Sequence, residues 1–188
     1  MNYGLPTTAS VNGVEYAIRS DYRVILDLIE ALSSDDYSGQ DRALAVLGVF
    51  YVSVPPHEDW EEAIKQAFLF ISMGQEEKKK ESPRLVDWGK DFPVIISAVN
   101  NVAKQEVRAL DYCHWWTFMG YFDSISSEST FANVVSIRSK KAKGKRLEKW
   151  EQEYYSENKH LVDIRKPINY TAEEQELLSS LRGEWHGS

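Results

Sequence analysis

The sequence predicts a mainly α protein in which an N-terminal β-hairpin is followed by a compact bundle of about seven or eight helices. Three observations indicate this fold class. Apolar residues recur at helical spacing along most of the chain, a hairpin signal lies at the N-terminus, and strands do not alternate with helices. No segment repeats at a fixed interval.

The length of 188 residues is enough for one domain with its own hydrophobic core. We expect a single helical domain over residues 1–160 and a C-terminal extension over 161–188 with a short amphipathic helix. The net charge of −7 argues against generic binding to nucleic acid or anionic membranes. The single Cys, the missing secretory signal and the short apolar runs indicate a cytoplasmic protein with no membrane segment.

The first elements follow from turn and cap residues. An Asn-Gly pair, which tolerates positive φ angles, predicts the β-hairpin at 7–18. Ser20 or Asp21 can cap a first helix that extends to about residue 32. A second, strongly apolar helix is expected at 40–52, before a Pro-Pro pair that cannot continue it.

Three further helices are expected in the middle of the chain. The third starts after the Pro-Pro pair with acidic first turns and ends at Gly74, before a charged loop at 74–84. The fourth starts with Asp91 as its cap. An aromatic helix follows, which contains the segment LDYCHWWTFMGYF at 110–122 and extends to about residue 125.

Shorter helices are expected after residue 128. One begins near Phe131 and precedes a basic run that Gly144 interrupts, and the next ends before Pro167. Thr171 and Glu174 then form a capping box for the last helix. Leu147, Trp150 and Tyr154 are expected on the inner face of the first of these two helices, and the last helix has Leu177, Leu178 and Leu181 as its apolar residues.

No residue pattern in the sequence indicates an enzyme or a cofactor site. Cys113 and His114 are neighbours, but side chains of adjacent residues on a helix point about 100° apart, so a buried Cys and a core His are expected. The four His residues are scattered and no Gly-rich phosphate loop is present. We therefore expect no catalysis, no metal and no cofactor.

Two segments of the sequence stand out in composition: one is rich in apolar and aromatic residues, and the other is rich in basic residues. If the segment 110–122 is helical, its aromatic residues lie on all sides of the helix. The protein's own core need not cover every side, so part of this surface can form a groove that accepts an apolar helix of another chain. The run 138–149 carries seven basic residues against one Glu. It indicates a docking patch for an acidic partner, and RNA binding through this run is an alternative.

Several motifs in order resemble a known family. They are VNGVEYAI, SDYR, PPHEDWEEAI, HWWxF at 114–118 and SIRSK at 136–140. Together, over about residues 5–160, they are similar to the bacteriophage gene-product-fifteen family, whose small proteins are encoded in the tail-gene modules of siphophages and prophages of Gram-positive bacteria.

The resemblance implies a non-enzymatic tail assembly chaperone in the host bacterial cytoplasm. Genes of this family usually lie between those of the major tail protein and the tape-measure protein, a position that tail chaperones generally hold. The implied partners are the tape-measure protein, the major tail (tube) protein and a second tail chaperone, and a homo-oligomer stays open. The alternatives are a structural tail component or connector retained in the virion, and an RNA-binding regulator that uses 138–149.

The residues expected to contact a partner come from three segments. They are the aromatic residues of the HWWxF motif, the first residues of the basic run and the apolar residues of the last helix. These residues are Trp115, Trp116, Phe118, Arg138, Lys140, Lys141, Leu178, Leu181 and Trp185.

Overall fold

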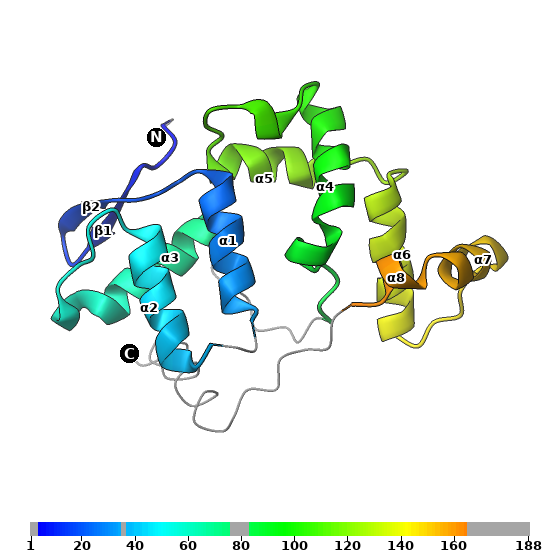
Figure 1. The fold of residues 1–188 in the computed structure, drawn as a ribbon, viewed down its shortest axis with the longest axis horizontal. Helices are drawn as coiled ribbons and strands as arrows, with labels where there is room; N and C mark the ends of the chain where they lie inside the picture. The colour runs from blue at the N-terminus through cyan, green and yellow to red at the C-terminus, as the bar shows by residue number, and fades with distance from the viewer. Residues whose placement is uncertain (1–3, 35–36, 76–82, 165–188) are drawn as a thin grey trace. The chain divides into compact units, whose positions relative to one another are not determined.

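A computed structural model describes residues 4–34, 37–75 and 83–164, and these residues form two compact units. In the described part of the chain, the N-terminal unit contains 4–75 and 114–116, and the C-terminal unit contains 83–113 and 117–164. The mainly helical fold with an N-terminal hairpin is confirmed (Figure 1). The expectation of a single domain over 1–160 stays a prediction.

The N-terminal hairpin pairs β1 (Thr8–Val11) with β2 (Val14–Ala17) in antiparallel register. Asn12 and Gly13 form the turn with φ angles of 48° and 85°. This left-handed geometry is why an Asn-Gly pair is needed there. Beyond the strands, Ile18 forms an isolated bridge with Tyr51, which ties the hairpin to the chain that follows the second helix.

Three helices complete the N-terminal unit: α1 (Tyr22–Leu32), α2 (Gly39–Phe50) and α3 (Trp60–Ile71), the last preceded by the 3₁₀ turn η1 (His57–Asp59). The side chain of Asp21 caps α1, as expected, and Ser38 forms a capping box with Asp41 at the start of α2. Helix α2 packs against α1 and α3, and α3 packs against β1. The largest fully buried side chains between these elements are Val11, Tyr22, Ile25, Leu28, Leu47, Phe50 and Tyr51.

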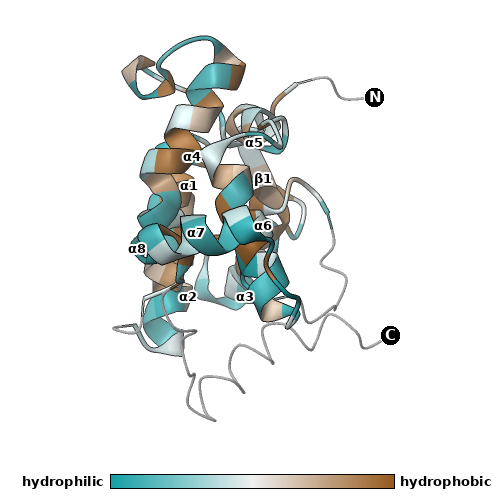
Figure 2. Cartoon of the chain, turned by 90° about the vertical axis from the view of Figure 1, so that its right-hand side faces the viewer, coloured by the Kyte–Doolittle hydropathy of each residue, from teal (hydrophilic) through white to brown (hydrophobic). Residues whose placement is uncertain are grey.

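The C-terminal unit contains α4 (Trp88–Ala103), the turn η2 (Val107–Ala109), most of α5 (Trp115–Asp123), α6 (Thr130–Ala142), α7 (Lys149–Glu157) and the short α8 (Lys159–Val162). Helix α6 packs against α4 and α8, and α7 packs against α8. Figure 2 shows that α4 is rich in hydrophobic residues and that α7 is mostly hydrophilic. Gly144, with a φ angle of 63°, follows the end of α6, where the sequence indicated a break.

The expected start of the fourth helix was wrong by one turn. Asp87, not Asp91, is the N-cap of α4, and its side chain accepts the backbone N–H of Lys90. Asp91 lies inside the helix, where its carboxylate accepts the backbone N–H of Asp87. Pro93 consequently lies in the second turn of α4. The sequence offers two Asp residues one turn apart, and local cap preference alone does not distinguish them.

The expected aromatic helix also begins later than predicted. Residues 110–114 are not helical, and α5 begins at Trp115. His114 instead forms an isolated β-bridge with Asp21, and the backbone N–H of Trp115 donates to the carbonyl of Ser20. These hydrogen bonds to a distant segment replace the helical ones that local apolar spacing favours.

The inner face expected for the helix at 147–154 was wrong at Trp150. Its side chain is 47% exposed, whereas Glu151 in the next position is 1% exposed. The carboxylate of Glu151 accepts the ammonium of Lys140 at 2.7 Å and the backbone N–H of Glu148 at 2.8 Å. A buried carboxylate with these partners is stable, so the charged residue takes the inner position.

The residue that caps the turn η2, Glu106, has an exposed carboxylate whose pKa is strongly lowered. The guanidinium of Arg108 donates to both carboxylate oxygens of Glu106 at 2.8 Å, and the backbone N–H of Arg108 donates as well. These hydrogen bonds lower the pKa of Glu106 to about 2, with a smaller contribution from Asn100.

We expect the carboxyl group of Glu106 to titrate near pH 2 when it is followed by NMR. Because this pKa lies below the unfolded value, the contribution of Glu106 to stability is fully present above the unfolded pKa and is lost as the pH falls through about 2. Arg108→Ala should return the titration toward the ordinary pKa of a Glu. An unchanged midpoint in Arg108→Ala would contradict this assignment.

Candidate peptide-binding groove

The basic residues expected to bind a partner have partners within the C-terminal unit. Arg138 is buried and paired with Asp91, while the ammonium of Lys140 lies 2.7 Å from Glu151. The ammonium of Lys141 lies 2.8 Å from Asp163 and 3.6 Å from the ring centroid of Tyr155. Hydrogen bonds from Lys141 and Tyr155 hold the pKa of Asp163 below its usual range.

The aromatic residues of the HWWxF motif are largely covered. Trp115 and Phe118 are buried, and Trp116 is half-buried with its ring stacked on Phe70 at 5.8 Å between centroids. The expected contact residues Leu178, Leu181 and Trp185 lie outside the described residues. The role of these six side chains in partner contact stays a prediction.

Cys113 and His114, the tempting catalytic neighbours, are both buried. Nδ1 of His114 accepts the backbone N–H of Trp116 at 3.0 Å, and Nε2 lies 2.9 Å from the carbonyl oxygen of Pro6. The neutral ring therefore carries its proton on Nε2 and donates it to Pro6. Both ring nitrogens form hydrogen bonds with backbone groups, so His114 joins the start of α5 to the N-terminal segment.

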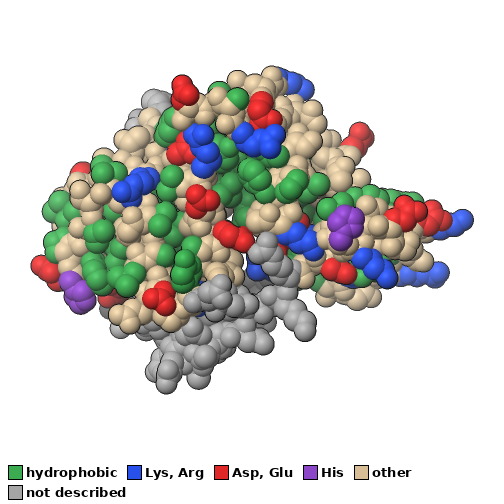
Figure 3. Space-filling model, viewed as in Figure 1, with side chains coloured by type: hydrophobic (Ala, Val, Ile, Leu, Met, Phe, Trp, Pro, Cys, Tyr) green, Lys and Arg blue, Asp and Glu red, His purple; other side chains and the backbone are tan. Residues whose placement is uncertain are grey.

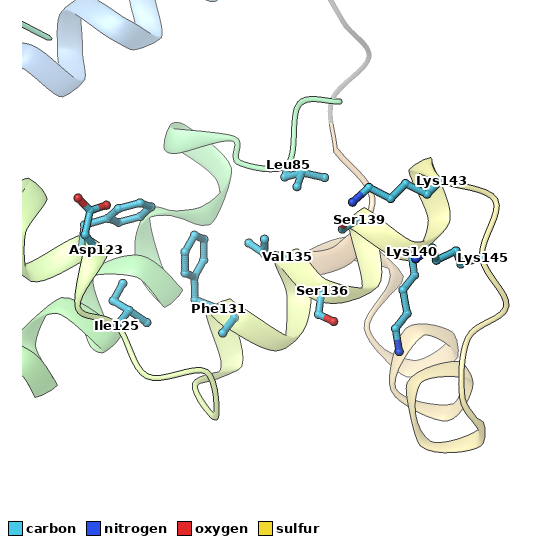
Figure 4. A pocket seen from close by; sticks show the side chains of 12 residues that line it. Leu85, Asp123, Ile125, Phe131, Val135, Ser136, Ser139, Lys140, Lys143 and Lys145 are labelled. Atoms are coloured by element: carbon cyan, nitrogen blue, oxygen red, sulfur yellow. The ribbon is translucent and has the colours of Figure 1, made fainter. Parts of the chain in front are cut away.

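An open groove of about 660 Å³ lies in the C-terminal unit, and its floor is apolar. Phe131 and Val135 of α6 form the floor together with Phe122 and Ile125 from the end of α5 and the segment after it, and Leu85 lies at the edge (Figure 4). The ring of Phe122 packs between Trp88 and Phe131, at centroid distances of 4.8 and 5.4 Å. Two of the three rings in this row, Phe122 and Phe131, are therefore part of the floor itself.

The two ends of the groove carry opposite charges. Lys140, Lys143 and Lys145 line one end, and Asp123 lies at the other (Figure 4). Lys140 is paired with Glu151, but Lys143 and Lys145 are exposed and have no ion-pair partner among the described residues. Two ammonium groups at one end of an apolar floor favour an occupant with an acidic end and an apolar middle.

The amino-acid sequence indicates the region of this groove but not the residues that line it. The basic run at 138–149 includes Lys143 and Lys145, yet neither was chosen as a contact residue. The helical spacing of Phe131, Val135 and Ser139 was the available signal, because residues four apart lie on one helix face. The part of the floor that comes from the end of α5 depends on tertiary packing and left no local signal.

Other exposed apolar side chains lie on the N-terminal unit. Figure 3 shows hydrophobic side chains over the part of this unit where Figure 1 places α2 and α3. Large hydrophobic residues with exposed side chains in this unit include Val14, Leu44, Val52, Val54 and Phe68. The apolar surplus of the sequence is therefore not all covered within the described residues.

Two further properties concern the described residues alone. No group of three or more His, Cys, Asp or Glu side chains among them is placed to hold a metal ion. None of the helices formed by residues 4–34, 37–75 and 83–164 combines the length and the apolar character needed to cross a membrane.

Comparison with protein families identifies a bacteriophage protein. The chain belongs to the family described as Bacteriophage Gp15 protein, whose model matches residues 1–164. The resemblance expected from the sequence motifs is thereby confirmed. Neither the comparison with curated proteins nor the comparison with solved structures gave a match.

Proposed function

We propose that the protein is a non-enzymatic tail assembly chaperone that binds apolar helical segments of the tape-measure protein in the cytoplasm of the host bacterium. The observation that carries this proposal is the open groove with its apolar floor and its free lysine end. Membership of a bacteriophage family supports a role in a bacteriophage-infected cell. A tape-measure protein is a long, helical and apolar chain, and such a chain must be kept from aggregating before the tube forms around it.

The groove suits one face of a helix. An α-helix with its side chains is about 10 Å wide, and an amphipathic one presents apolar residues three and four positions apart. Such a face can cover Phe131 and Val135 on the floor, while acidic residues at one end of the guest helix meet Lys143 and Lys145. The apolar contact supplies affinity, and the charges fix the direction of the guest in the groove.

Co-expression with fragments of the tape-measure protein from the same tail module tests the proposal. We expect one or more helical fragments to become soluble and to co-purify with the full chain. Lys143→Glu with Lys145→Glu should weaken capture about tenfold, because two favourable charge contacts become repulsive. Lys149→Glu with Lys159→Glu is the matched control, since these exposed lysines do not line the groove and the net charge change is the same.

A second variant tests the floor. Val135→Asp places an unpaired carboxylate on the apolar floor and should abolish capture while the chain stays folded, because Val135 is only partly buried. Circular dichroism verifies the fold of each variant. Capture that is equal in the wild type, Val135→Asp and the lysine pair would show that the groove is not the binding site, and failure of every tape-measure fragment to co-purify would contradict the chaperone itself.

A further inference from the structure

Helix α2 is apolar on the side that the N-terminal unit leaves uncovered. The residues that it buries share the side that packs against α1 and α3, and they include Arg42, Val46, Leu47 and Phe50. The opposite side, at helical spacing, consists of the exposed residues Asp41, Leu44 and Gly48 with the partly exposed Ala45. Leu44 is 45% exposed. Because a helix that is apolar all round is normally covered all round, the outer side of α2 indicates a second contact.

Gly48 leaves a depression on this outer face of α2. Apart from its chain neighbours and the helix's own backbone, no atom of the described residues lies within 4 Å of the point where a Cβ would stand. Two helices approach most closely, with axes about 8 Å apart, where the side chains at the contact are small. Leu44, one turn earlier on the same face, is an apolar side chain that fills such a depression. The face therefore carries both a protruding side chain and a place that accepts one.

The two ends of the outer face carry opposite charges. Asp41 is an exposed acidic residue in the first turn of α2. At the other end, Nη1 of Arg19 donates to the carbonyls of Gly48 and Val49, both at 3.0 Å, and to that of Tyr51. Arg19 is exposed, and its other guanidinium N–H groups bind no acceptor among the described residues. A cation at the C-terminal end and an anion at the N-terminal end make the face complementary to its own reverse.

We propose that the outer face of α2 pairs with the same face of a second copy of this chain, antiparallel about a two-fold axis level with residue 46. Residues equally far from 46 then oppose each other, so Leu44 of each copy packs on Gly48 of the other. Asp41 of each copy lies beside Arg19 of the other. A two-fold axis makes each contact twice and sets the two helix dipoles against each other. The pairing is independent of the proposed function, because the groove belongs to the C-terminal unit.

Sedimentation velocity of the full chain, over about 1–100 μM, tests the pairing. One helix face is a small interface, so we expect a reversible dimer with a Kd in the micromolar range. Gly48→Leu fills the depression and should weaken association about tenfold. The same change meets open space in the monomer and replaces a poor helix former, so the melting temperature should not fall. Gly120→Leu is the matched control, because Gly120 is an exposed helical glycine of α5 that also faces open space.

A second variant, Leu44→Glu, replaces the protruding side chain with a carboxylate that has no partner in the dimer, and it should weaken association at least as much. Trp150→Glu is its control, because Trp150 is 47% exposed and lies on α7 of the other unit. A wild-type chain that stays monomeric up to about 100 μM would overturn the pairing, as would a dimer that Gly48→Leu and Leu44→Glu leave unchanged. A monomeric wild type in which Gly48→Leu weakens capture of a tape-measure fragment would assign the face to the guest helix instead.

Discussion

Arg138→Ala is expected to lower the free energy of unfolding by about 3–5 kcal/mol, because it leaves a buried carboxylate without its counter-charge. The guanidinium of Arg138 is 4% exposed and binds both oxygens of Asp91, at 2.5 and 2.8 Å. It also donates to the backbone carbonyls of Leu85, Leu161 and Val162. One side chain thus joins α4, α6, α8 and the edge of the groove.

Urea denaturation followed by circular dichroism measures this loss. Arg138→Lys should recover little of it, because an ammonium cannot reproduce the two parallel hydrogen bonds or reach all three carbonyls. Arg138→Met with Asp91→Leu should be more stable than Arg138→Ala, since no buried charge is left alone. Arg146→Ala, at an exposed position, is the control and should change stability by less than about 0.5 kcal/mol. A loss of that small size in Arg138→Ala would show that the contacts of Arg138 with Asp91 and the three carbonyls do not stabilise the fold.

The early elements could be predicted from the sequence because local chemistry determines them. The Asn-Gly turn adopts a geometry that few other residue pairs tolerate, and Asp21 satisfies the exposed N–H groups at the start of α1. Gly74 and Gly144 follow the ends of α3 and α6 with positive φ angles. At each of these positions, the backbone conformation that a few neighbouring residues prefer is the one they adopt in the folded protein, so local sequence is enough to predict it.

The aromatic segment could not be placed correctly because its hydrogen-bond partners are distant in sequence. Trp115 donates its backbone N–H to Ser20, and the ring of His114 lies against Pro6. Apolar spacing is the same whether or not residues 110–114 are helical, so periodicity could not reveal the extended chain. Long-range backbone pairing overrode local preference here.

The candidate groove was only partly predictable for a similar reason. The basic run gave the correct region, but seven basic residues in sequence do not show which are paired. Arg138 turns inward to Asp91, Lys140 binds the buried Glu151, and Lys143 has no such partner among the described residues. A difference of a few positions on a helix changes which face a side chain occupies. The pairing depends on α4, α7 and α8, which pack around α6 and the chain that follows it only in the folded protein.

Trp115→Ala is expected to lower the free energy of unfolding by about 3–5 kcal/mol, as large-to-small changes of buried aromatic residues do. The indole ring of Trp115 is 2% exposed, and its Nε1 donates to the carbonyl of Ile71 at 2.9 Å. The substitution therefore leaves a cavity and removes a hydrogen bond to the last residue of α3. Trp115→Phe should cost less, because it keeps most of the ring volume and loses the hydrogen bond.

Trp116→Ala should lower the free energy of unfolding by less than Trp115→Ala does. The difference between the two variants separates a Trp that packs in the core from one that is partly exposed. Trp116 is half-buried, and its Nε1 donates to the carbonyl of Phe70 at 2.9 Å. Trp116 does not line the groove, and its role in partner contact is a separate prediction. A loss of guest capture beyond the loss of stability in this variant would support that role. Tyr112→Ala, at a side chain that is 52% exposed, is the control for an exposed aromatic residue. Thermal and urea denaturation of the four variants, measured with capture of a tape-measure fragment, separates packing from binding. If Trp115→Ala were as stable as Tyr112→Ala, the attachment of the HWWxF motif to α3 would be wrong.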